Sequence, residues 1–162
     1  GPPHLEKETS MALRLSTGLR DKLLGEGSFK EIMADGVVRI FPGTQPTSAD
    51  DAEGATHLVQ ITLGSGTFTA GAAENGLEFG AASGGVLSKG SGEVWSGVAS
   101  VTGTAGWFRF YANDLTTGAS TANARFDGSI STSGAQLNMS STAITAGATT
   151  TIDSFTITFP AS

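Results

Sequence analysis

Three acidic side chains stand close together in one loop and are the first candidates for chemistry. Asp50, Asp51 and Glu53 lie in the segment PGTQPTSADDAEGAT, residues 42–56. Carboxylate oxygens are the ligands that a hard cation such as Ca²⁺ prefers. The segment lacks the Asp-x-Asp-x-Asp-Gly order of an EF-hand loop, however. A solvated acidic loop is therefore the favoured interpretation, and cation binding is the alternative.

His57 follows this loop directly and is the only histidine after the first ten residues. A histidine can act as a general base when the fold brings a nucleophile and an orienting acid beside it. Neither partner accompanies His57 at a recognisable spacing, and the chain has no cysteine, which excludes a thiol nucleophile and a cysteine metal site. The sequence thus predicts a protein that is not an enzyme, with no catalytic residues, no metal site and no cofactor.

Four aromatic side chains fall within five positions of SVTGTAGWFRFYA, residues 100–112. Alternation along an extended strand places Trp107, Arg109 and Tyr111 on one face and the two phenylalanines on the other. Trp107 and Tyr111, if exposed, would form a platform on which a sugar ring can stack. Aromatic residues of a central strand usually pack the core, so burial is the first expectation and a glycan platform is the alternative.

The segments that position these residues are predicted to be short strands. The strand over residues 100–112 is expected to be the central one. Alternating patterns predict further strands over residues 37–41, 57–63, 93–101, 125–131, 136–140 and 149–159. About eight short strands with frequent turns and no βαβ rhythm indicate an all-β fold, an antiparallel β-sandwich or jelly roll. A solenoid is the competing architecture, but no fixed repeat period supports it.

Several contacts within this sheet can be predicted from the strand patterns. Arg109 and Asp127 lie on strands joined by a polar loop, so a cross-strand salt bridge is expected between antiparallel neighbours. The side chains expected to point into the core from the two strands 93–101 and 149–159 are Val94, Trp95, Val98, Val101, Phe155, Ile157 and Phe159.

Three parts of the chain differ in character. The Gly-Pro start is typical of what a protease leaves after removal of a purification tag, so residues 1–10 are interpreted as a tag remnant. Residues 11–34 form a helical N-terminal arm, in which Ser16 or Thr17 caps a helix ending at Gly25, and Ser28 forms a capping box with Glu31. Residues 35–162 form a single β-sandwich domain.

The arm carries more apolar side chains than two short helices can bury against each other. Those predicted to contact a partner are Leu13, Leu15, Leu19, Leu23, Phe29, Ile32 and Met33. Exposed apolar patches usually mark interfaces, so the arm is expected to mediate homo-oligomerisation or docking to another protein. Packing across the open end of the protein's own sandwich is the alternative.

Charge is unevenly distributed along the chain, whose net charge is −6. From Phe41 onward the chain has nine carboxylates and only three basic residues, Lys89, Arg109 and Arg125. An acidic body of this kind repels a polyanion, so nucleic acid is not an expected partner. The sequence also lacks an apolar run approaching the ~20 residues of a membrane helix, so no membrane association is expected.

Five blocks of the sequence carry a resemblance that covers most of the chain. They are RLSTGLRDKLLG (14–25), GVVRIFPGTQPTSADDAEGATHLVQIT (36–62), AGWFRFY (105–111), RFDGSISTSGAQLNM (125–139) and TTTIDSFTITFP (149–160). In order and spacing they resemble a family of small virion structural proteins of tailed bacteriophages and prophages.

The resemblance implies a bacteriophage virion protein that is made in the cytoplasm of the bacterial host. Among virion roles, the size and the acidic β-domain suit a capsid decoration or cement protein, which binds and stabilises the shell. Its partners would be the phage capsid or other virion proteins. A receptor-binding or glycan-binding tail component is the alternative.

Overall fold

A computed structural model of the chain describes residues 13–159. Two short helices, α2 (Thr17–Gly25) and α3 (Phe29–Ile32), accompany a fold made mostly of strands. The strands are β1 (Arg14–Leu15), β2 (Val37–Pro42), β3 (Val59–Leu63), β4 (Val86–Ser88), β5 (Trp95–Val98), β6 (Gly103–Tyr111), β7 (Arg125–Ser131), β8 (Leu137–Asn138), β9 (Ala143–Ile144), β10 (Thr149–Ile152) and β11 (Thr156–Thr158). The fold is all-β and sandwich-like, as the sequence predicts.

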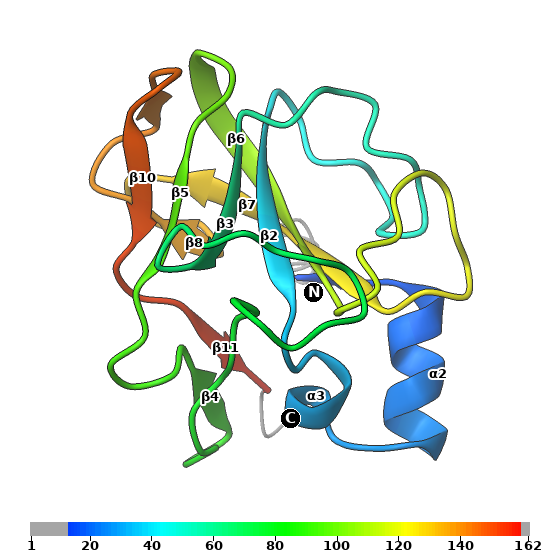
Figure 1. Cartoon of the computed structure of the whole chain (residues 1–162). Coiled ribbons are helices and arrows are strands. Elements are labelled where there is room, and N and C mark those ends of the chain that lie inside the picture. Colours follow the sequence, from blue (N-terminus) through cyan, green and yellow to red (C-terminus); the bar gives the residue numbers. More distant parts are fainter. Residues whose placement is uncertain (1–12, 160–162) are drawn as a thin grey trace, which may run out of the picture.

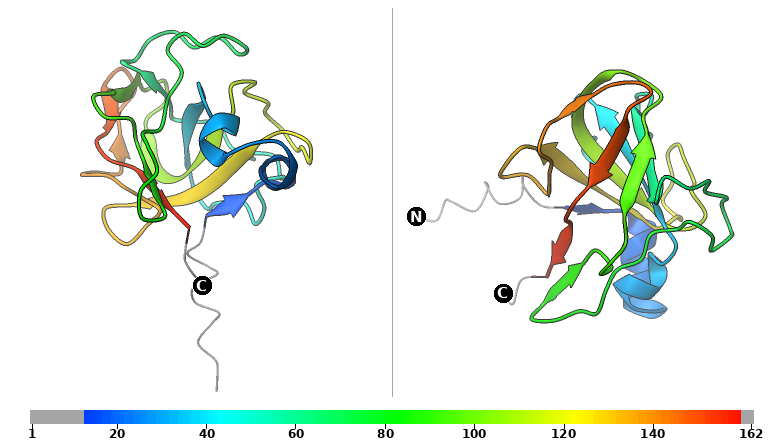
Figure 2. Two further views of the ribbon diagram at one scale, coloured as in Figure 1. Left: turned by 90° about the horizontal axis from the view of Figure 1, so that it is seen from below. Right: turned by 60° about the vertical axis from the view of Figure 1, so that its left-hand side comes forward.

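One large sheet holds most of the strands, in the order β1-β7-β6-β2-β3-β5-β10 (Figure 1). Neighbours along this order are antiparallel, while β8 joins the edge of β7 in parallel and β9 pairs with β6. The long strand β6 lies between β2 and β7, which confirms its predicted central place. The remaining strands, β4 and β11, form a separate ribbon, which lies at the same end of the molecule as the two helices (Figure 2).

The core is built on the inward face of β6 and is dominated by aromatic rings. Phe110 is fully buried and stacks on Phe126 of β7 at 5.1 Å and on Phe79 at 5.3 Å between ring centroids. Phe155 packs edge-on against Phe108 at 5.4 Å. Such ring pairs add roughly 0.5–1.5 kcal/mol each beyond the area they bury, so this cluster ties β6 and β7 to the segment between β10 and β11.

Two predicted strands differ from those observed. Val94, Val98 and Val101 are exposed, at 55%, 57% and 37%, although Trp95 is fully buried. Adjacent residues of a strand point to opposite faces, so Trp95 takes the core face of this strand, and Val94 and Val98 point away from it. The prediction that all of these valines enter the core is wrong.

The segment 149–159 also differs, because it divides into two strands that belong to different sheets. β10 pairs with β5 and β11 pairs with β4. Phe155 and Ile157 are buried as predicted, but Phe159 is 53% exposed. The break after Ile152 lets Phe155 enter the main core. The chain then continues into the ribbon, where Phe159 is only partly covered.

The arm is docked on the sandwich of its own chain. The side chain of Ser16 accepts a hydrogen bond from the Leu19 backbone N–H at 3.1 Å, and the predicted capping box of Ser28 and Glu31 is present. β1, which the sequence analysis did not predict, pairs with β7 and anchors the arm.

This docking corrects the expectation that the whole arm is available to a partner. Leu19, Phe29 and Met33 are buried in the core, since the helices close the end of the sandwich. The other predicted contact residues pack against the core while partly exposed: Leu13, Leu15, Leu23 and Ile32.

Candidate functional site

A buried cluster of charged side chains lies on the face of β6 that points away from the aromatic core. Arg109 of β6 and Asp127 of β7 are directly opposite each other in the register of the two strands. Arg109 donates from Nε to Asp127 Oδ1 at 2.6 Å and from Nη2 to Asp127 Oδ2 at 3.0 Å. The predicted cross-strand pair is confirmed, and both side chains are fully buried.

Arg125 lies beside this pair on β7 and binds the backbone of two loops. Its guanidinium donates to the carbonyl oxygens of Ala49 at 2.7 Å, Asp50 at 3.1 Å and Asp51 at 3.2 Å, and to that of Thr116 at 2.9 Å. Arg109 adds a bond from Nη1 to the Asp51 carbonyl at 2.8 Å. Two fully buried guanidinium groups therefore hold the acidic loop against the sheet.

Glu53 and Tyr111 extend the cluster at the far end of the loop. The Tyr111 hydroxyl donates to Glu53 Oε2 at 2.6 Å, and the Gly118 backbone N–H donates to Oε1 at 2.9 Å. Arg109 Nη1 lies 3.4 Å from Glu53 Oε2. Although burial acts to raise it, the pKa of Glu53 is below its ordinary value because of these donors. Burial raises the pKa of the Tyr111 hydroxyl, and the hydrogen bond to Glu53 raises it further.

The three acids of the loop point to separate partners. Asp50 accepts from the backbone N–H of Thr17 at 2.8 Å and from its hydroxyl at 2.7 Å, which ties the loop to the start of α2. Asp51 accepts from the Ser48 backbone N–H at 3.2 Å. Burial acts to raise the pKa of Asp50, but the Thr17 bonds and nearby arginines lower it below the ordinary value. Within residues 13–159, no three side chains of His, Cys, Asp or Glu are arranged to hold a metal ion.

The aromatic residues on this face are covered by the loop. Trp107 is 1% exposed and Tyr111 is fully buried. The Trp107 ring stacks on Phe41 at 4.3 Å between centroids, and its N–H donates to the Pro42 carbonyl at 3.2 Å. The proposed glycan platform of Trp107 and Tyr111 is therefore wrong, because neither ring presents a face to solvent.

His57 lies at the border of this site without the partners that a general base needs. Its half-buried ring contacts Phe41 edge-on at 6.3 Å. Burial first, and then the positive charge of Arg39, lower the pKa of His57 below its ordinary value. In the part of the chain that the structure describes, no hydrogen bond joins this ring to an acid or to a hydroxyl.

The arrangement as a whole is suited to fixing a loop. Its charged groups are paired with one another, with backbone carbonyls and N–H groups, or with hydroxyls. The sequence analysis did not predict that Arg125 and Glu53 hold the loop against the sheet. The Arg-x-Asp spacing of Arg125 and Asp127 is a signal for the first, because strand alternation places both on the face of Arg109.

A search of protein-family models, curated proteins and solved structures found no match to this chain. No helix within residues 13–159 has the length and apolar character that crossing a membrane requires.

Proposed function

We propose that this chain is a non-enzymatic structural protein of a bacteriophage virion, and that it decorates the capsid by binding and stabilising the shell. The proposal rests on the five sequence blocks that resemble small phage virion proteins. The observation that carries it is the buried cluster of Arg109, Arg125 and Asp127, because residues of four of these blocks meet there.

The contacts of the cluster cross between the blocks. Arg109 belongs to block 105–111, and Arg125 and Asp127 belong to block 125–139. The carbonyls that the two arginines bind belong to block 36–62, except that of Thr116. Thr17 of block 14–25 joins through Asp50. The blocks that carry the resemblance are thus used to give one long loop a single shape.

A rigid loop supports the proposed role for a physical reason. A decoration protein must present the same surface to many equivalent sites on a shell, so a flexible contact loop would lose conformational entropy each time it bound. The carbonyls and carboxylates of residues 49–53 are already fixed in the free protein, so this conformational entropy is not lost on binding.

Cryo-electron microscopy of particles from the phage or prophage that encodes this chain would test the proposal. Density for the fold on the outer surface of the shell is the expected result. A tail location would reject capsid decoration in favour of a tail component, and particles that lack the protein would reject the virion role altogether. Adding purified protein to shells that lack it should also raise the temperature at which the shells open.

A further inference from the structure

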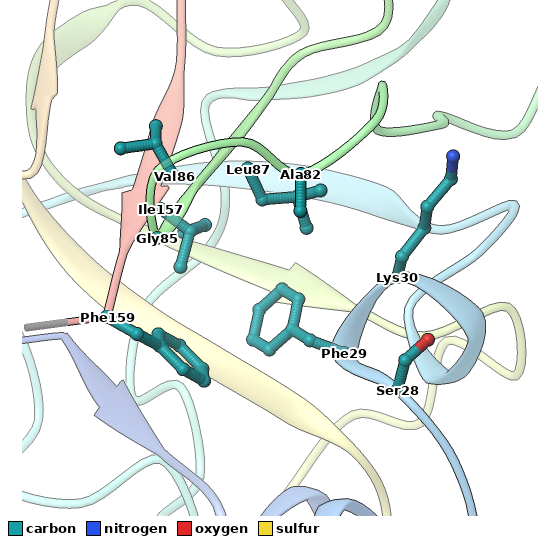
Figure 3. Close-up of a pocket in the computed structure, with 9 residues that line it drawn as sticks. All are labelled: Ser28, Phe29, Lys30, Ala82, Gly85, Val86, Leu87, Ile157 and Phe159. Carbon is teal, nitrogen blue, oxygen red and sulfur yellow. The ribbon is translucent and has the colours of Figure 1, made fainter. Parts of the chain in front are cut away.

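An apolar pocket of about 230 Å³ opens between α3 and the ribbon of β4 and β11. Figure 3 shows the rings of Phe29 and Phe159 side by side within its lining, with Lys30 on α3 and Ser28 just before the helix. Leu87 and Ile157 form the inner wall. Phe159 is 53% exposed there, so the pocket presents uncovered apolar surface in a protein that is otherwise strongly acidic.

The best counterpart to this pocket lies on the same chain. Leu24, near the end of α2, is 88% exposed and is the most exposed of the large apolar side chains described. A cavity of about 150 Å³ admits a benzene molecule, so a pocket of this size admits a leucine side chain. α2, α3 and the ribbon lie at the same end of the molecule (Figure 1), and Leu24 precedes Ser28 of the pocket lining by four residues in the sequence. Its own chain leaves Leu24 in solvent.

We propose that a second copy of this chain covers the pocket, with Leu24 of each copy inserted into the pocket of the other. A reciprocal contact of this kind is isologous and closes as a two-fold dimer. The inference is independent of the virion role, because it concerns only how copies of this chain meet.

Charge favours a second copy as the occupant. The exposed charges on the two helices include Lys22 and Glu26, whose side chains lie 3.6 Å apart, and Lys30 and Glu31. This face is therefore balanced, whereas the body is acidic. The proposed contact places Leu24 in a pocket that Lys30 of the second copy lines, so Glu26, two residues after Leu24, is the carboxylate that the proposal pairs with that lysine. Opposite charges at the rim of an interface favour the correct register over alternatives.

Sedimentation velocity on the full chain, from about 1 µM to about 1 mM, tests the contact. The wild-type mass should rise with concentration from 16.3 kDa toward twice that value. Leu24→Asp removes two buried leucines per dimer and should weaken dimerisation at least about 100-fold. Ala82→Trp, which fills the pocket from an exposed position in its lining, should have the same effect. Val98→Asp, on a strand away from the helices, is the matched control and should leave the mass unchanged.

A charge exchange tests the register of the contact. Glu26→Lys and Lys30→Glu should each weaken the dimer, and the two changes together should restore it. A wild-type chain that stays at 16.3 kDa throughout would overturn the inference. So would a Leu24→Asp variant that dimerises like the wild type, or a double exchange that dimerises no better than either single change.

Discussion

Replacing Asp127 by asparagine should destabilise the protein by about 3 kcal/mol, because it leaves the buried Arg109 guanidinium without its main counter-charge. Removing one partner of a buried ion pair typically costs about 3–5 kcal/mol. Arg109 keeps two contacts in the variant, the Asp51 carbonyl at 2.8 Å and Glu53 at 3.4 Å, which places the expected loss at the lower end. The asparagine side chain has nearly the same shape, so the loss comes from the missing charge and from the amide nitrogen that replaces one of the two acceptor oxygens.

Urea denaturation measures this loss directly. With a slope of about 2 kcal/mol per molar urea, the midpoint should fall by about 1.5 M. Asp153→Asn removes one carboxylate at an exposed position and is the control, for which a change below about 0.5 kcal/mol is expected. An Asp127→Asn variant within that same margin would refute the reasoning, since it would mean that the pair contributes nothing net to stability. A double-mutant cycle with Arg109→Met then separates the coupling from the effect of each change alone.

Three further outcomes are expected. Trp107→Ala should lower the free energy of unfolding by roughly 3–5 kcal/mol, because the ring is buried against Phe41; a loss below 1 kcal/mol in urea denaturation, well under that range, would contradict its place beneath the loop. Ser28→Ala should cost about 1 kcal/mol through loss of the α3 cap, and threonine at that position should recover most of it. Because the pKa of His57 is lowered in the folded state, the unfolded chain takes up its proton first, so stability should fall as the pH drops below about 6.5. His57→Gln should flatten that part of the profile in unfolding measurements between pH 8 and pH 5, and an unchanged slope would assign the pH dependence to other groups.

Local chemistry made much of the fold predictable. The alternation in residues 105–111 identified the faces of β6, and the Ser28 and Glu31 pattern identified the start of α3, because each signal depends only on neighbours in sequence. The division of residues 149–159 was not predictable in this way. Its alternation changes phase at Asp153 and Ser154, which separate Ile152 from Phe155, but only the distant partners β5 and β4 decide that the chain changes sheets there.

The same distinction applies to the candidate site. The pairing of Arg109 with Asp127 follows from strand alternation and from the polar loop, residues 112–124, that joins the two strands. Its burial does not, because the cover comes from a loop with no periodic pattern, whose backbone carbonyls bind Arg109 and Arg125. A carbonyl carries no signature in the sequence, so the sequence analysis treated this loop as solvated acids and kept a glycan platform of Trp107 and Tyr111 as the alternative to their burial.

The use of both arginines inside the protein has a consequence for its surface. From Phe41 onward the basic residues are Lys89, Arg109 and Arg125, and the two arginines are fully buried. The Lys89 ammonium donates to the Glu93 carbonyl. The β-body therefore presents few positive charges to solvent, chiefly those of Arg39 and Lys89, and two acidic bodies repel each other wherever their sheets would meet. Contacts between copies are favoured only where charges balance, and α2 with α3 provides that surface beside an open apolar pocket.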